Sequence, residues 1–80
     1  MSSRLEKCIK VVEEHLRMAE PLDVMGEKLL SLASDYFEDA LYYKDRDTEV
    51  SLEAISYASG LIDAGVLLGV IRIKTHYFNE

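Results

Sequence analysis

Apolar residues recur along much of this chain with the period of an α-helix. In the segment 52–71, apolar and small residues fall on one face when successive residues are placed about 100° apart around a helix axis. That core stripe consists of Ala54, Ile55, Ala58, Leu61, Ile62, Gly65, Val66 and Gly69. Small residues recur along it, so a neighbouring helix can approach it closely. The segment therefore predicts a helix that the rest of the fold packs around.

Two earlier segments show the same period, and local signals mark the helix ends. Ser3 begins a capping-box pattern, and Pro21 ends the first helix because the residue before a proline is pushed out of the α region. Asp23 supplies the second N-cap, and Asp47 or Thr48 supplies the third. We predict an all-α, three-helix antiparallel bundle with helices at about 3–19, 24–44 and 48–71, followed by a short irregular C-terminal tail.

The predicted third helix is more apolar on its outer side than a solvated face needs to be. Exposed apolar surface of this kind commonly marks an interaction site. The candidate interaction surface consists of Leu52, Gly60, Asp63, Leu67, Val70 and Ile71. Asp63 has two interpretations: it keeps an exposed face soluble, or it makes a polar contact inside a partner interface, where its charge needs a donor. The spacing Gly65-x-x-x-Gly69 indicates internal packing, because both glycines fall on the core stripe.

A second candidate site combines acidic and aromatic residues from the predicted second and third helices. It consists of Asp35, Tyr36, Asp39, Tyr43 and Tyr57, of which Asp39 lies nearest the core-facing stripe. This group is either a small polar binding site or a solvated helix flank whose tyrosine rings pack while their hydroxyls reach water. The Glu-x-x-His spacing of di-iron bundles is absent from the sequence, and we predict no metal and no cofactor.

Composition and charge narrow the class of protein. Eighty residues predict a single domain over 1–80, near the size at which a partner often helps to complete a core. The net charge of -6 opposes attraction to nucleic acids and anionic membranes. Cys8 is the only cysteine, which excludes an internal disulfide and suits a reducing compartment. Asp63 interrupts the most apolar stretch, and charges from Arg4 onward precede any apolar run, so we expect a cytoplasmic protein with no membrane span and no secretory signal.

Three segments together match a known pattern. They are R-L-E-K-C-I at 4–9, D-Y-F-E-D-A-L-Y-Y at 35–43 and A-I-S-Y-A-S-G-L-I-D-A-G-V-L-L-G at 54–69. The chain resembles the short archaeal proteins grouped as domain of unknown function family 357. The resemblance implies a small helical bundle from an archaeal cytoplasm, and it transfers no catalytic residue.

These observations favour a non-catalytic protein–protein interaction module, most simply a homodimer that associates through the outer face of the third helix. The alternative is an accessory or regulatory subunit of a nucleotide- or RNA-handling enzyme that uses the tyrosine and acid group as its binding site. A stand-alone enzyme is not expected, because no nucleophile arrangement, metal set or phosphate-binding loop can be assembled from these residues.

Overall fold

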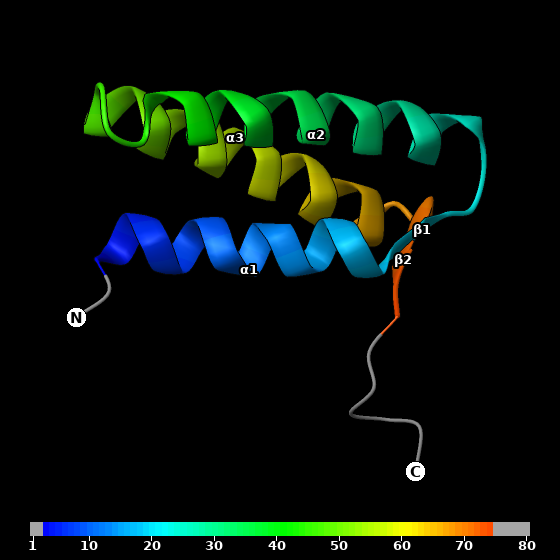
Figure 1. Ribbon diagram of the computed structural model, residues 1–80. Helices are drawn as coiled ribbons and strands as arrows, with labels where there is room; N and C mark the ends of the chain where they lie inside the picture. The colour runs from blue at the N-terminus through cyan, green and yellow to red at the C-terminus, as the bar shows by residue number, and fades with distance from the viewer. Residues whose placement is uncertain (1–2, 75–80) are drawn as a thin grey trace, which may run out of the picture.

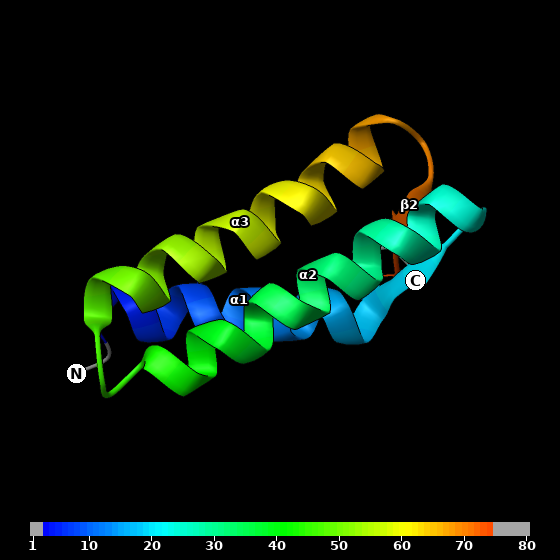
Figure 2. The same cartoon turned by 90° about the horizontal axis from the view of Figure 1, so that it is seen from above.

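A computed structural model describes residues 3–74 and shows three helices joined by short connections (Figure 1). Helix α1 spans Arg4–Met18, α2 spans Val24–Tyr43 and α3 spans Thr48–Leu67. Helices α1 and α3 run in the same direction and α2 runs against them. Seen from above, α2 and α3 lie side by side and α1 lies beneath the pair (Figure 2). The predicted all-α, antiparallel three-helix bundle is confirmed.

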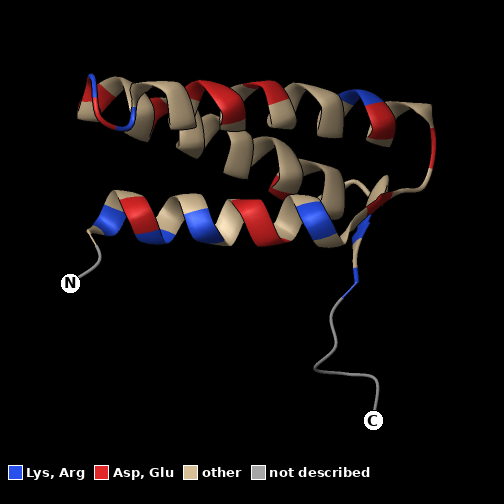
Figure 3. Cartoon of the chain, in the orientation of Figure 1, with Lys and Arg blue, Asp and Glu red and all other residues tan. Residues whose placement is uncertain are grey.

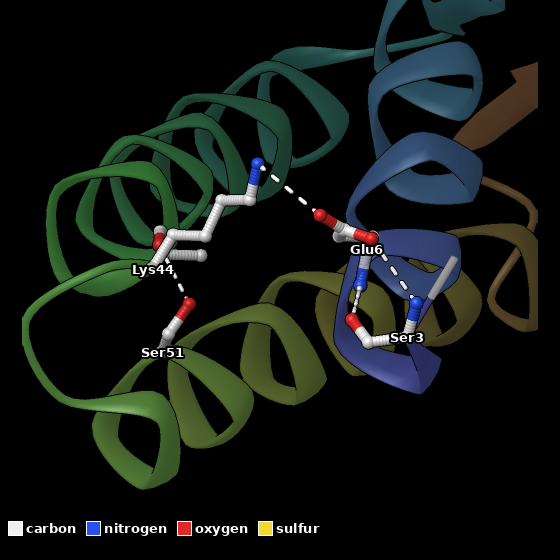
Figure 4. Close-up of polar contacts among 5 residues, drawn as sticks. Ser3, Glu6, Lys44 and Ser51 are labelled. Carbon is white, nitrogen blue, oxygen red and sulfur yellow. Dashed lines mark hydrogen bonds and ion pairs between the residues drawn. The ribbon is translucent and has the colours of Figure 1, made fainter. Parts of the chain in front are cut away.

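Each helix begins at a side chain that accepts a backbone hydrogen bond. Ser3 and Glu6 form a reciprocal capping box, in which the Ser3 hydroxyl accepts from the Glu6 N–H at 3.1 Å and the Glu6 carboxylate accepts from the Ser3 N–H at 3.0 Å (Figure 4). Asp23 accepts from Gly26 N–H at 2.9 Å, and Asp47 accepts from Val50 N–H at 3.2 Å. The structure therefore selects Asp47 as the cap of α3.

Helix α3 ends four residues earlier than the periodicity predicted, at Leu67 instead of Ile71. Gly69 adopts a left-handed conformation with φ of 77°, and the Val70 N–H donates to the Gly65 carbonyl at 2.9 Å. Together with the 3.1 Å bond from the Gly69 N–H to the Val66 carbonyl, this is a Schellman cap, which reverses the chain. Gly69 thus terminates the helix, and its predicted place on the core stripe was wrong.

The reversed chain forms a short strand where an irregular tail was predicted. Strand β2, Ile71–Ile73, pairs antiparallel with β1, Ala19–Pro21, the segment that links α1 to α2. Glu20 stands opposite Arg72 in this pairing, and the Arg72 Nε donates to the Glu20 carboxylate at 3.1 Å. Ile71, predicted as the last residue of the helix, therefore begins the strand, and the tail predicted over 72–80 is a strand at 72–73. Residues 75–80 lie outside the described residues.

The Glu20–Arg72 pair gives a testable pH dependence. The hydrogen bond from Arg72 is the main cause that lowers the pKa of Glu20. Because the folded pKa lies below the unfolded one, the pair stabilises the fold above the usual glutamate range and loses this effect as the pH falls through the lowered pKa. Carboxyl NMR titration should show the Glu20 pKa rising in Arg72→Gln. Arg17→Gln, which removes a cation that forms no ion pair with Glu20, should leave it unchanged; an equal shift in both variants would contradict this assignment.

The core lies where α1 packs onto the α2–α3 pair. It consists of Leu5, Ile9 and Val12 from α1, Ala33 and Ala40 from α2, and Ala54, Ile55, Ala58 and Ile62 from α3. Alanines on the facing sides of α2 and α3 leave room for close backbone approach. The stripe predicted on α3 is thus buried from Ala54 to Gly65, except that Leu61 is half-buried, and Val66 is exposed.

A buried polar contact ties α2 to α3. Ser51 is fully buried, and its hydroxyl donates to the Ala40 carbonyl at 2.6 Å (Figure 4). The same end of the bundle carries an ion pair between Lys44 and Glu6 at 3.8 Å, which links α2 to α1. Sequence periodicity did not single out Ser51, because an isolated serine on a helix gives no signal of burial.

Candidate functional site

Two shallow hollows meet on the outer face of α3. The first, here the α1–α3 groove, has a volume of about 460 Å³ and lies between α1 and α3. Its lining residues are Lys7, Cys8, Val11, Val12, Ile55, Ser56, Ser59, Gly60 and Asp63. The second, here the Tyr57 hollow, is a more open depression lined by Leu52, Glu53, Ser56, Tyr57, Gly60 and Leu61. Ser56 and Gly60 belong to both, so the hollows form one continuous surface.

Four of the six residues predicted as an interaction surface lie exposed on α3. They are Leu52, Gly60, Asp63 and Leu67, and Leu67 is the most exposed large apolar side chain of the described residues at 88%. The C-terminal half of α3 carries almost no charge (Figure 3), so little polar surface interrupts these apolar positions. The outer face of α3 is therefore apolar and uncovered.

The prediction was wrong for Ile71, and Val70 is only partly exposed. Ile71 is 2% exposed, because the chain reversal at Gly69 turns it inward and its side chain packs against Gly65. Val70 is half-buried, and its carbonyl accepts a hydrogen bond from the Leu22 N–H at 2.9 Å. Both residues fix the end of α3 to the rest of the fold and do not extend its outer face.

The first helix supplies a wall that the sequence interpretation missed. Lys7, Cys8 and Val11 line the α1–α3 groove, and Val11 is a half-exposed apolar side chain beside the core face of α1. The only sequence signal was Val11 itself, which precedes the buried Val12 and widens the apolar face of the helix. Pairing this wall with α3 required knowing how the two helices pack.

Gly60 stands at the junction of the two hollows. An alanine methyl group at this position would meet no atom within 4 Å, so no intrachain contact requires glycine. A glycine inside a helix costs up to about 1 kcal/mol relative to alanine. Gly60 is thus an unfavourable helix residue that leaves the backbone of α3 open to close approach from outside.

The predicted tyrosine and acid group divides into two aromatic pairs. Tyr36 and Tyr57 stack with ring centroids 5.1 Å apart and an interplanar angle of 15°. Tyr43 packs edge-on against Tyr42 at 4.9 Å. Tyr42 also lies 4.1 Å beneath the Arg46 guanidinium. Each stacked ring uses one face on the other, and Tyr57 remains 62% exposed where it lines the Tyr57 hollow.

The acids of that group stay on the surface of α2. Asp35 and Asp39 are exposed, and neither forms an ion pair with another residue between 3 and 74. Across the same described range, no three His, Cys, Asp or Glu side chains come together as a metal site would require. The described part of the chain therefore offers charged surface here, without convergent ligands.

Helix α3 is also long and apolar enough to cross a membrane when judged by length and composition alone. Core helices of globular proteins pass the same test, and one side of α3 forms the centre of this core. Its apolar character is therefore explained on the inner side by packing, which leaves only the outer side to be accounted for.

The fold and the site define a small all-α domain whose helix α3 has an exposed apolar outer face. The family model described as "Protein of unknown function (DUF357)" matches residues 3–71, so the chain belongs to this family. No curated protein and no solved structure matches the chain. The resemblance of the three sequence segments is thus confirmed at the level of the family.

Proposed function

We propose that this protein is a non-catalytic interaction module that self-associates through the outer face of α3. The observation that carries the proposal is Leu67, which is 88% exposed at the end of an apolar helix face. Leu52 stands on the same side of α3 about four turns earlier, at an exposed fraction of 37%. Covering such side chains with a partner removes apolar surface from water, which favours association.

The small residues of this face support the same conclusion. Ser56 and Gly60 lie where the two hollows meet, and neither presents a bulky side chain. Helices approach each other most closely where small residues line both sides of the contact. A helix that keeps Gly60 without an internal reason is consistent with a partner helix that crosses α3 at this point.

Self-association is expected to depend on Leu67. Wild-type protein should sediment as a species heavier than a monomer at micromolar concentration, and Leu67→Asp should weaken the association at least about tenfold, because a charge would be buried in an apolar contact. The matched control is Val24→Asp, which places the same charge at a 65% exposed apolar residue that lines neither hollow.

Sedimentation equilibrium over a range of concentrations measures both effects. The control should associate as the wild type does. A wild-type chain that remains monomeric throughout, or a Leu67→Asp variant that associates with unchanged affinity, contradicts the proposal.

A further inference from the structure

The α1–α3 groove carries one positive and one negative side chain at opposite corners. Lys7 belongs to the wall formed by α1 and Asp63 to the wall formed by α3. The two helices run in the same direction (Figure 1), and Lys7 lies in the first turn of α1 whereas Asp63 lies just before the last turn of α3. The two charges are therefore separated both across the groove and along it.

Both charges are available to a partner. The ion pairs among residues 3–74 join Glu6 with Lys44 and Glu20 with Arg72, so neither Lys7 nor Asp63 takes part in one. The remaining lining of the groove is uncharged. A charge that is covered by a partner without a counter-charge is costly, so an occupant of this groove must supply an anion near Lys7 and a cation near Asp63.

A second copy of the chain meets this requirement. A two-fold axis that lies in the plane of the contact, perpendicular to the line from Lys7 to Asp63, brings Lys7 of each protomer to Asp63 of the other. Closed dimers of this kind use one surface patch on both subunits. This pairing of opposite charges favours association, whereas two chains of net charge -6 otherwise repel each other.

We propose that the second copy docks groove to groove, with the helices of the two protomers crossing at the contact and two symmetric Lys7–Asp63 ion pairs between protomers. This inference rests on the proposed self-association and specifies its geometry. Ser56, Ser59 and Gly60 on the α3 wall allow the two copies to approach. Val11 supplies apolar surface in the groove, and Leu67 supplies more one turn beyond Asp63 on α3. Asp63 is then a polar contact within the interface, one of its two sequence-based interpretations.

A charge-reversal mixing experiment tests this geometry. In a homodimer of Lys7→Glu, the introduced carboxylate faces Asp63 at both contacts, and in a homodimer of Asp63→Lys, the introduced amine faces Lys7 at both. Each variant should therefore associate about tenfold or more weakly than wild type. In the mixed dimer, one contact pairs the two introduced groups and the other pairs the native Lys7 and Asp63, so both are complementary. An equimolar mixture of the two variants should form heterodimers with an affinity within about twofold of wild type.

Two control variants separate local pairing from overall charge. Lys10→Glu and Asp39→Lys make the same charge changes at exposed residues outside both hollows. Each should associate much as the wild type does, and their mixture should show no preference for heterodimers. All four substitutions lie at exposed positions, and far-UV circular dichroism should confirm that each variant folds.

The outcomes distinguish the two proposals. A wild-type dimer whose affinity survives both single reversals, or whose weakened variants are not rescued by mixing, overturns this geometry while self-association stands. Rescue by Lys7→Glu with Asp63→Lys in one chain but not by mixing also overturns it, because the pair would then form within a protomer. A wild-type chain that is monomeric at all concentrations overturns both proposals.

Discussion

Replacement of Gly26 by alanine is expected to lower the free energy of unfolding by about 3 kcal/mol, a large share of the stability of a small domain. Gly26 is buried in the first turn of α2, and an added Cβ atom would overlap the carbonyl oxygen of Val70. It would also lie 3.1 Å from the Val70 carbonyl carbon and 3.3 Å from the Cα atom of Pro21. These are backbone atoms, so relief requires a shift of the chain and not a side-chain rotation.

The Val70 carbonyl is itself held in place, which is why the cost should be high. It accepts a hydrogen bond from the Leu22 N–H at 2.9 Å, between the end of α3 and the link into α2. Movement of this carbonyl to admit a methyl group would strain that bond and the adjoining strand pair. Local overpacking at Gly26 is therefore expected to destabilise the end of the bundle at which β1 pairs with β2.

Gly60→Ala is the matched control for this substitution. The same methyl group enters open space on α3, so the variant should be more stable than wild type by about 0.5–1 kcal/mol through helix propensity. Urea unfolding, followed by circular dichroism at low protein concentration to limit any contribution from association, measures both variants. Similar effects at the two glycines would contradict the close packing of Gly26.

Truncation of Ile62 is the second substitution with a large expected effect. Ile62→Ala should destabilise the fold by about 3–4 kcal/mol, because the side chain is 1% exposed at the centre of the core and its removal leaves a cavity between helices. For a domain of this length, each kcal/mol corresponds to a fall in melting temperature of roughly 4–8 °C. Thermal unfolding should therefore show a marked loss.

Leu68→Ala provides the comparison at the end of the same helix. Leu68 is 70% exposed, so its truncation should change the free energy of unfolding by less than about 0.5 kcal/mol. If Leu68→Ala proves as costly as Ile62→Ala, the inner and outer sides of α3 are not as the structure assigns them.

Much of the helical framework was predictable because its signals are local. The Ser3–Glu6 capping box and the caps at Asp23 and Asp47 act within one turn of the chain, and all three are present. The apolar period of α3 likewise identified Ala54, Ala58 and Ile62 as core. These features need no knowledge of distant segments, so sequence order was sufficient to find them.

The end of α3 shows where periodicity misleads. Gly69 continued the 3.6-residue pattern of the core stripe, but its left-handed conformation caps the helix. Glycine fits either role, and the choice depends on whether the following residues gain more by pairing with 19–21 than by extending the helix. Ile71, expected on the outer face, became a core residue for this reason.

By itself, the sequence determined the number of helices, their starts and the inner face of α3. Capping and helical period are local signals, which residues only a few positions apart in the chain define. Only the tertiary structure decided that Ile71 and Ser51 are buried and that Lys7 and Asp63 share one groove. Those outcomes depend on contacts between different elements, such as the bond from Ser51 to Ala40 and the pairing of 71–73 with 19–21. The hydrophobic pattern shows that a helix has a buried side, but which neighbour covers it, and what is left uncovered, follows from packing alone.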